Sequence, residues 1–241
     1  MNLLHNFLFN VYPYLCLAVF LMGSLARFDR DQYTWKSDSS QLLRAGQLRW
    51  GSNLFHGGIL FLFFGHLFGQ LTPHAVYGLF ISPTQKQWLA VVAGGVAGAA
   101  CFVGLTMLLH RRLFDPRIRL TSHRTDIAVL VILWLQLALG LATLPSSVRH
   151  AADPRTMTVL ADYLQGIATF RPDAAALVGI EWHYLAHMVL GMTIFLLFPF
   201  SRLVHVWSGF ATVAYLVRPY QVVRARRLNL PPGTDRPHGA R

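Results

Sequence analysis

Apolar residues in this chain form five long stretches separated by shorter polar segments. The stretches cover residues 3–26, 52–71, 88–109, 126–144 and 183–207. A helix needs about 20 mostly apolar residues to cross the hydrocarbon core of a bilayer. The pattern therefore predicts an all-α integral membrane protein, a multi-pass bundle of five transmembrane helices.

Composition supports this interpretation and excludes two other classes of protein. Of the 241 residues, 54% are hydrophobic and only 13% are charged, whereas about 25% are charged in a typical soluble domain. Such a chain is too apolar to be intrinsically disordered. Its two cysteines, Cys16 and Cys101, lie in apolar stretches and are expected to be small core residues rather than a disulfide framework. We expect one membrane domain over residues 1–228 and a polar, disordered cytoplasmic tail over 229–241.

The basic residues alternate between successive polar segments. Five of the 21 Lys and Arg residues lie in 27–50, one in 72–87, five in 110–125, three in 145–182 and six in the tail. Cytoplasmic loops collect Lys and Arg, so we expect the N-terminus outside and the C-terminus in the cytoplasm. The net charge of +11 is then a signal of topology and does not indicate a nucleic-acid partner. Positive charge follows the first apolar stretch rather than preceding it, which favours a retained helix over a signal peptide.

Four histidines lie deep in the expected spans, where ionisable residues are costly and usually functional. The predicted topology puts His66 level with His187 nearer the outside, and His56 level with His205 nearer the cytoplasm. The ten residues between the histidines of the second span rise about 15 Å in a straight helix, and the eighteen of the fifth rise about 27 Å. Helix tilt, slanted macrocycles or a kink at Pro199 must absorb the difference. In a straight fifth helix, His187 and His205 share one face.

Two pairs of histidines at two depths favour two haem groups, each held by two imidazoles between facing helices. His183, one turn from His187, is a rival ligand, but it lies at the edge of its span. Glycines next to the histidines, such as Gly57 and Gly65, suit either a macrocycle or close helix packing. A histidine relay for protons is the alternative function. It normally needs intramembrane carboxylates, and the expected spans have only Asp126, at an edge.

The chain resembles a known family over almost its whole length. Long ordered strings carry the resemblance, among them Gln32-Tyr33-Thr34-Trp35, Ser52-Asn53-Leu54-Phe55-His56 and Phe198-Pro199-Phe200-Ser201-Arg202-Leu203. They resemble the gamma subunit of bacterial respiratory nitrate reductase, a dihaem cytochrome b. The resemblance implies that His56 and His205 ligate the iron of an inner haem b, and that His66 and His187 ligate that of an outer haem b.

The resemblance also implies a quinol site near the outer haem, with a lysine that matches Lys86. This lysine is the one basic residue of its loop, and the plainer alternative is a solvated loop charge. His66 and Gly65 are its expected neighbours in the site. Arg202 and Arg112 are candidate partners for haem propionates, with lipid phosphate as the alternative for Arg202.

The implied function is that of the membrane-anchoring, quinol-oxidising subunit of a multi-subunit oxidoreductase in the bacterial cytoplasmic (inner) membrane. By this resemblance, menaquinol or ubiquinol is expected to be oxidised near the outer face. Electrons would then pass through the two haems to an iron–sulfur beta subunit and a molybdenum-containing alpha subunit, which would reduce nitrate. The same dihaem module serving a different reductase is the alternative. Two basic regions, at 111–119 and 218–227, are expected to meet anionic membrane lipid or acidic surfaces of the cytoplasmic subunits.

Overall fold

The computed structural model describes residues 2–31 and 43–208, and this part of the chain is helical without strands. Residues up to His205 form one compact unit, described below. The expected tail at 229–241 and the basic region at 218–227 lie outside the described residues. The helices are α1 (Leu3–Asn6), the π-helix η1 (Phe7–Val11), α2 (Tyr12–Asp31), α3 (Ala45–Leu71), α4 (His74–Tyr77), α5 (Pro83–Phe114), α6 (Pro116–Leu120), α7 (Arg124–Ala142), α8 (Leu144–Arg149), α9 (Arg155–Ala168), the 3₁₀-helix η3 (Ala174–Leu177), α10 (Trp182–Leu197) and the 3₁₀-helices η4 (Phe198–Phe200) and η5 (Arg202–Val204).

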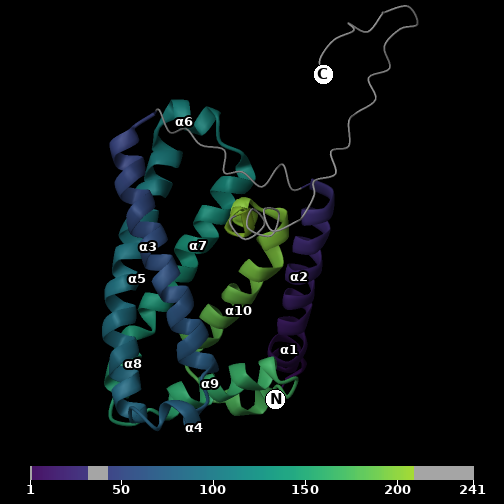
Figure 1. Cartoon of the computed structure of the whole chain (residues 1–241), viewed down its shortest axis with the longest axis vertical. Helices are drawn as coiled ribbons and strands as arrows, with labels where there is room; N and C mark the ends of the chain where they lie inside the picture. Colours follow the sequence, from purple (N-terminus) through teal and green to yellow (C-terminus); the bar gives the residue numbers. More distant parts are fainter. Residues whose placement is uncertain (1, 32–42, 209–241) are drawn as a thin grey trace, which may run out of the picture. The chain divides into compact units, whose positions relative to one another are not determined.

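Five helical segments are long and apolar enough to cross a membrane, as the apolar pattern predicts. They are Leu3–Arg30, Ala45–Leu71, Pro83–Phe114, Arg124–Arg149 and Trp182–Phe200. The helix α3 packs on α5, α5 on α7, α7 on α10 and α10 on α2 (Figure 1). The short helices α4, α8 and α9 lie at one end of this bundle and α6 lies at the other. The orientation in the membrane remains a prediction.

Two of the spanning helices, α3 and α5, extend beyond their apolar stretches into polar segments. The helix α5 begins with a capping box, in which Ser82 and Gln85 exchange hydrogen bonds between side chain and backbone, and Pro83 occupies its first turn. It ends at Phe114, where Asp115 caps the following helix, α6. The helix α3 begins at Ala45, ahead of the first apolar residues. The apolar pattern marks the part of a helix inside the membrane, whereas at α5 the capping box decides where the helix itself begins.

The expectation of a fifth span over residues 183–207 is wrong at its C-terminal end. The regular helix α10 ends at Leu197, and the chain continues through the 3₁₀-helices η4 and η5. Pro199 explains the break, because proline has no N–H to donate and its ring clashes with the preceding turn. His187 and His205 therefore do not lie on one straight helix. The redirected chain absorbs the difference in spacing between the two histidine pairs.

Small residues bring α3 and α5 into close contact. A Cβ atom added to Gly58 would lie 2.6 Å from Cβ of Cys101, and one added to Gly104 would lie 2.5 Å from the backbone nitrogen of Phe55. Both cysteines are buried and free, as expected for small core residues. Close approach through small residues is the usual way in which membrane helices gain packing contacts.

A second packed cluster joins the start of the first span to α9. Tyr163 of α9 is buried against Phe9 and donates a hydrogen bond from its hydroxyl to the Phe9 carbonyl, 2.6 Å away. Burial raises the pKa of Tyr163, with a smaller contribution from Tyr14, so its hydroxyl keeps the proton that it donates. Phe9 lies in the π-helix η1, where the usual helical hydrogen bonding is interrupted.

Candidate functional site

The four deep histidines meet as two pairs, each joining α3 to the chain segment of α10 and η5. The ring centroids of His56 and His205 lie 6.3 Å apart, and those of His66 and His187 lie 6.2 Å apart. His56 and His66 belong to α3 and His187 to α10, while His205 directly follows η5. These are the pairs that the alternation of loop charge puts at equal depth.

The separation of the rings suits one metal ion between each pair. An imidazole nitrogen binds a transition metal at about 2 Å. That nitrogen is about 1 Å from its ring centre, so two imidazoles on opposite sides of one metal have centroids about 6 Å apart. Within residues 2–31 and 43–208 there is no cluster of three or more His, Cys, Asp or Glu side chains that would hold a bare metal ion. Two opposed imidazoles fit a haem iron, whose other four ligands belong to the macrocycle.

All four imidazoles are oriented by a hydrogen bond from Nδ1 to a backbone carbonyl oxygen. His56 donates to Ser52 at 2.8 Å, and His66 donates to Leu62 at 2.7 Å. His205 donates to Arg202 at 2.6 Å, and His187 donates to Gln136 at 3.1 Å. A carbonyl oxygen only accepts, so in each ring the proton is on Nδ1 and the lone pair is on Nε2. This is the tautomer that a metal ligand needs.

The glycines near these histidines divide into two groups. A Cβ added to Gly57 or Gly65 would meet no atom within 4 Å, so these positions border space beside His56 and His66. Gly58 instead packs on α5, and a Cβ on Gly191 would lie 3.2 Å from Nε2 of Gln136. The macrocycle interpretation thus suits Gly57 and Gly65, whereas Gly58 and Gly191 provide close contacts within the protein.

Lys86 is buried, in contrast to a solvated loop charge. It lies in the first turns of α5, and the residue is only 8% exposed. Its Nζ atom lies 3.6 Å from the ring centroid of Tyr77 at the end of α4. No atom of the described residues forms a hydrogen bond with this Nζ. Gly65 and His66 lie on α3, which packs against α5.

Asp126 stands between the two arginines that are candidate propionate partners. Its Oδ2 atom lies 3.0 Å from Nη1 of Arg112 and 3.4 Å from Nη1 of Arg202. Arg112 also donates a hydrogen bond to the hydroxyl of Ser122. The backbone oxygen of Arg202 accepts the hydrogen bond from His205, which places this cluster beside the pair of His56 and His205. Two guanidinium groups share one carboxylate, so the cluster keeps one net positive charge.

His183 does not join the histidine pairs. Its Nε2 atom lies 3.2 Å from a carboxylate oxygen of Glu181, and its ring contacts Trp182 and Tyr184. His66 instead meets His187, one turn further along α10.

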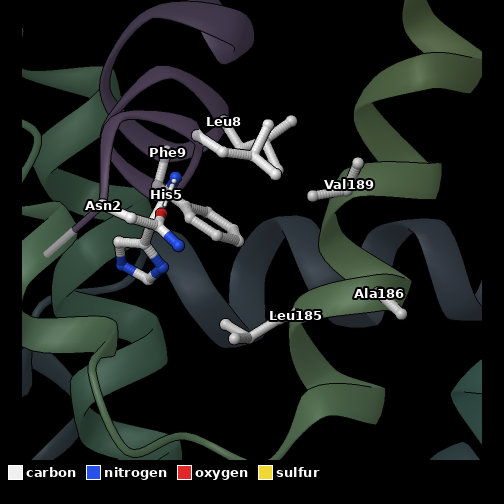
Figure 2. Close-up of a pocket in the computed structure, with 8 residues that line it drawn as sticks. Asn2, His5, Leu8, Phe9, Leu185, Ala186 and Val189 are labelled. Atoms are coloured by element: carbon white, nitrogen blue, oxygen red, sulfur yellow. Dashed lines mark hydrogen bonds between the residues drawn. The ribbon is translucent and has the colours of Figure 1, made fainter.

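An open apolar groove of about 400 Å³ lies between the start of the first span and α10 (Figure 2). Leu8 and Phe9 face Leu185 and Val189 across it. The polar ring at its edge, His5, is hydrogen-bonded through Nε2 to the carbonyl of Ala174 at 2.8 Å. The groove is therefore an apolar surface, and the hydrogen bond to Ala174 puts the proton of the His5 ring on Nε2 and the lone pair on Nδ1.

Comparison with known proteins assigns the chain to a family. A family model described as "Nitrate reductase gamma subunit" matches residues 5–226. The chain belongs to the nitrate reductase gamma subunit family. It is 48% identical to respiratory nitrate reductase 1 gamma chain of Escherichia coli K12 over 227 residues, which cover 94% of this chain and all of that protein. It is also 48% identical over 226 residues to the 2 gamma chain of the same organism, covering 93% of this chain and 98% of that one. Identity to the nitrate reductase gamma chain of Bacillus subtilis 168 is 39% over 221 residues, 91% of this chain and 97% of that one.

Three polar residues of this gamma subunit were not singled out from the sequence as parts of a site. Gln136 contacts His187, Tyr77 contacts Lys86, and Asp126 joins the two arginines. Gln136 and Asp126 did carry a signal, since a polar side chain in an apolar span is costly unless it has a partner. Tyr77 carried none, because its role depends on the contact between α4 and the start of α5.

Proposed function

We propose that this gamma subunit is the dihaem cytochrome b of a respiratory nitrate reductase. One haem b would be held between His56 and His205, and a second between His66 and His187. The observation that carries the proposal is the pair of imidazole separations, 6.3 Å and 6.2 Å. Both suit two ligands on opposite sides of one iron.

Hydrogen bonds within the protein give each imidazole the orientation and the tautomer of a metal ligand. Each Nδ1–H is committed to a backbone carbonyl, so in every ring the lone pair that can bind a metal is on Nε2. A haem held by two histidines would have no coordination site left for oxygen, which would favour electron transfer. When bound, the two haems supply one-electron redox centres at two depths of the membrane. Arg112 and Arg202 would pair with the propionates of the haem at His56 and His205, using the net positive charge left by Asp126.

Lys86 would bind quinol near the pair of His66 and His187. A buried ammonium without a hydrogen-bond acceptor is costly, and a quinol or quinone oxygen would provide one. Quinol oxidation yields quinone, two electrons and two protons. The alpha subunit would use the two electrons, with two protons, to convert nitrate into nitrite and water. This chain carries out no nitrate chemistry itself.

The orientation that we propose puts the pair of His66 and His187 at the outer face of the inner membrane. It rests on the alternation of basic residues between loops. Protons from quinol would then leave on the outside, while the electrons serve nitrate reduction in the cytoplasm. The basic end of α5, which contains Arg111 and Arg112, would lie on the side of the beta and alpha subunits.

The test is a count of haems in the purified complex and in ligand variants. We expect two b haems per gamma chain in the parent protein, and one each in His56→Ala and His66→Ala. His183→Ala is the matched control, since His183 contacts Glu181, and it should keep both haems. A parent complex that is purified intact without haem would overturn the proposal. Two haems retained in His66→Ala would overturn the ligand assignment.

A further inference from the structure

We propose that Gln136 of α7 is a positioning residue that sets the orientation of His187 and the redox potential of the haem held there. The inference rests on the proposed function and extends it to a helix that supplies no haem ligand. The observation behind it is a reciprocal contact between Gln136 and His187.

Gln136 meets His187 at two points. Its backbone oxygen accepts the hydrogen bond from Nδ1 of His187 at 3.1 Å. Its side-chain amide donates from Nε2 to the backbone oxygen of His187 at 3.0 Å. One residue of α7 therefore holds both the imidazole and the backbone of the ligand residue.

The three other ligand histidines are oriented locally. His56, His66 and His205 each donate Nδ1–H to a carbonyl three or four residues earlier in their own segment. These bonds form whenever the local backbone forms. Among the four, His187 alone depends on a residue 51 positions away in sequence. Its ring orientation is therefore decided by how α7 packs on α10.

Two glycines shape this contact. A Cβ added to Gly140, one turn after Gln136 on α7, would lie 2.9 Å from Cε1 of His187. A Cβ added to Gly191, one turn after His187 on α10, would lie 3.2 Å from Nε2 of Gln136. Real Cβ atoms are not found as close as the first distance, so Gly140 leaves the space that the imidazole occupies. The absence of a side chain at Gly191 leaves the space that the Gln136 amide occupies.

The amide of Gln136 also acts electrostatically on the ligand nitrogen. Its Nε2 lies 3.4 Å from Nε2 of His187. The hydrogens of an amide NH₂ carry partial positive charge. Positive charge near a redox centre favours its reduced form, so this amide should raise the midpoint potential of the outer haem relative to the same site without it.

The first test is Gln136→Met in the full complex. Methionine keeps an unbranched side chain of similar length but removes the amide. Redox titration of the two haem signals in membranes should show a lower midpoint potential for the outer haem and an unchanged one for the inner haem. Each signal is assigned by its absence from His66→Ala or His56→Ala. Unchanged potentials, or equal shifts of both, would overturn the inference.

The second test is Gly140→Ala, with Gly94→Ala as the control. The added methyl group at Gly140 should tilt His187, and so change or remove the low-spin electron paramagnetic resonance signal of the outer haem alone. A Cβ on Gly94 meets no atom within 4 Å, so this variant should keep both signals. An unaltered outer signal in Gly140→Ala contradicts the positioning role, even if Gln136→Met does not assemble. A parent protein without haem would instead refute the proposed function.

Discussion

Arg27 of α2 donates a hydrogen bond from Nη1 to the backbone carbonyl of Pro199, 2.7 Å away. The same nitrogen lies 3.2 Å from the carbonyl of Ser201. The break after α10 leaves carbonyl groups without helical partners, and Arg27 supplies a donor to two of them. One turn earlier, a Cβ added to Gly23 would lie 2.8 Å from Cβ of Pro199. The helix α2 therefore supports the turn that delivers His205 to His56.

We expect Arg27→Ala to weaken binding of the inner haem while sparing the outer one. Hydrogen bonds from a charged donor contribute about 2 kcal/mol each when buried, so the turn at Pro199 should loosen. The measurement is the haem-to-protein ratio, with the two signals resolved by redox titration. Arg30→Ala, at an exposed position of the same helix, is the control and should retain both haems. Equal loss of the two haems would argue against a local role for Arg27.

The contact between Tyr77 and Lys86 predicts a graded effect on quinol binding. Partial burial, and next the carboxylate of Asp162, raise the pKa of Tyr77, so its ring stays neutral and can face the Lys86 ammonium. A desolvated cation–π contact is worth about 1–2 kcal/mol. Tyr77→Leu should therefore raise the KM for quinol about tenfold, since 1.4 kcal/mol is about a factor of ten.

Tyr77→Phe keeps the aromatic ring and is the matched variant, with a KM near that of the parent. Nitrate reduction with an electron donor that reaches the alpha and beta subunits directly should be unchanged in both variants. If Tyr77→Phe proved as defective as Tyr77→Leu, the hydroxyl rather than the ring would be the important group.

Asp126→Asn should destabilise the protein and raise the potential of the inner haem. Arg112 and Asp126 are 11% and 12% exposed, so the ion pair is largely withdrawn from water. Breaking a fully buried pair costs roughly 3–5 kcal/mol. The remaining exposure reduces the expected loss to about 2 kcal/mol. Loss of a negative charge beside the haem that we propose at His205 would favour the reduced iron.

Thermal denaturation followed by haem absorbance measures the stability change, and redox titration measures the shift in potential. Asp153→Asn is the control, because Asp153 is exposed in the loop before α9. An inner-haem potential that stays at the parent value in Asp126→Asn would show that the cluster lies too far from the haem to influence it.

From the lowered pKa of Asp115, we predict that the local stability at the junction of α5 and α6 depends on pH. The backbone N–H of Ile118 lowers the pKa of Asp115, against an opposing effect of desolvation, and the N–H of Arg117 and the Arg44 guanidinium lower it further. Because the pKa is depressed in the folded state, the stabilisation is present above the ordinary value of 3.8 and is lost as the pH falls through the folded value. The protection factors of the α6 amides, which are corrected for the slower intrinsic exchange at low pH, should fall on acidification in the parent protein. Asp115→Ala, which removes the acceptor for both N–H groups, should have low protection factors at neutral pH already, and a variant as protected as the parent would contradict this role.

The sequence by itself determined the five spans and the grouping of the histidines. Runs of apolar residues identify membrane helices because the bilayer core imposes a length and excludes charge. The alternation of Lys and Arg supplied a direction for each span, and direction is enough to group His66 with His187 and His56 with His205. Neither inference needs contacts between distant residues.

Only the tertiary structure decided how those histidines are held. His205 reaches His56 through a broken helix supported by α2, and His187 is oriented by Gln136 of α7. The burial of Lys86 under Tyr77 likewise arises where α4 meets the start of α5. Each of these features depends on side chains that are distant in sequence or on the route of the chain between helices. A local pattern of apolar and polar residues reflects the free energy of transferring each side chain out of water. That free energy does not determine which neighbour a buried polar group contacts.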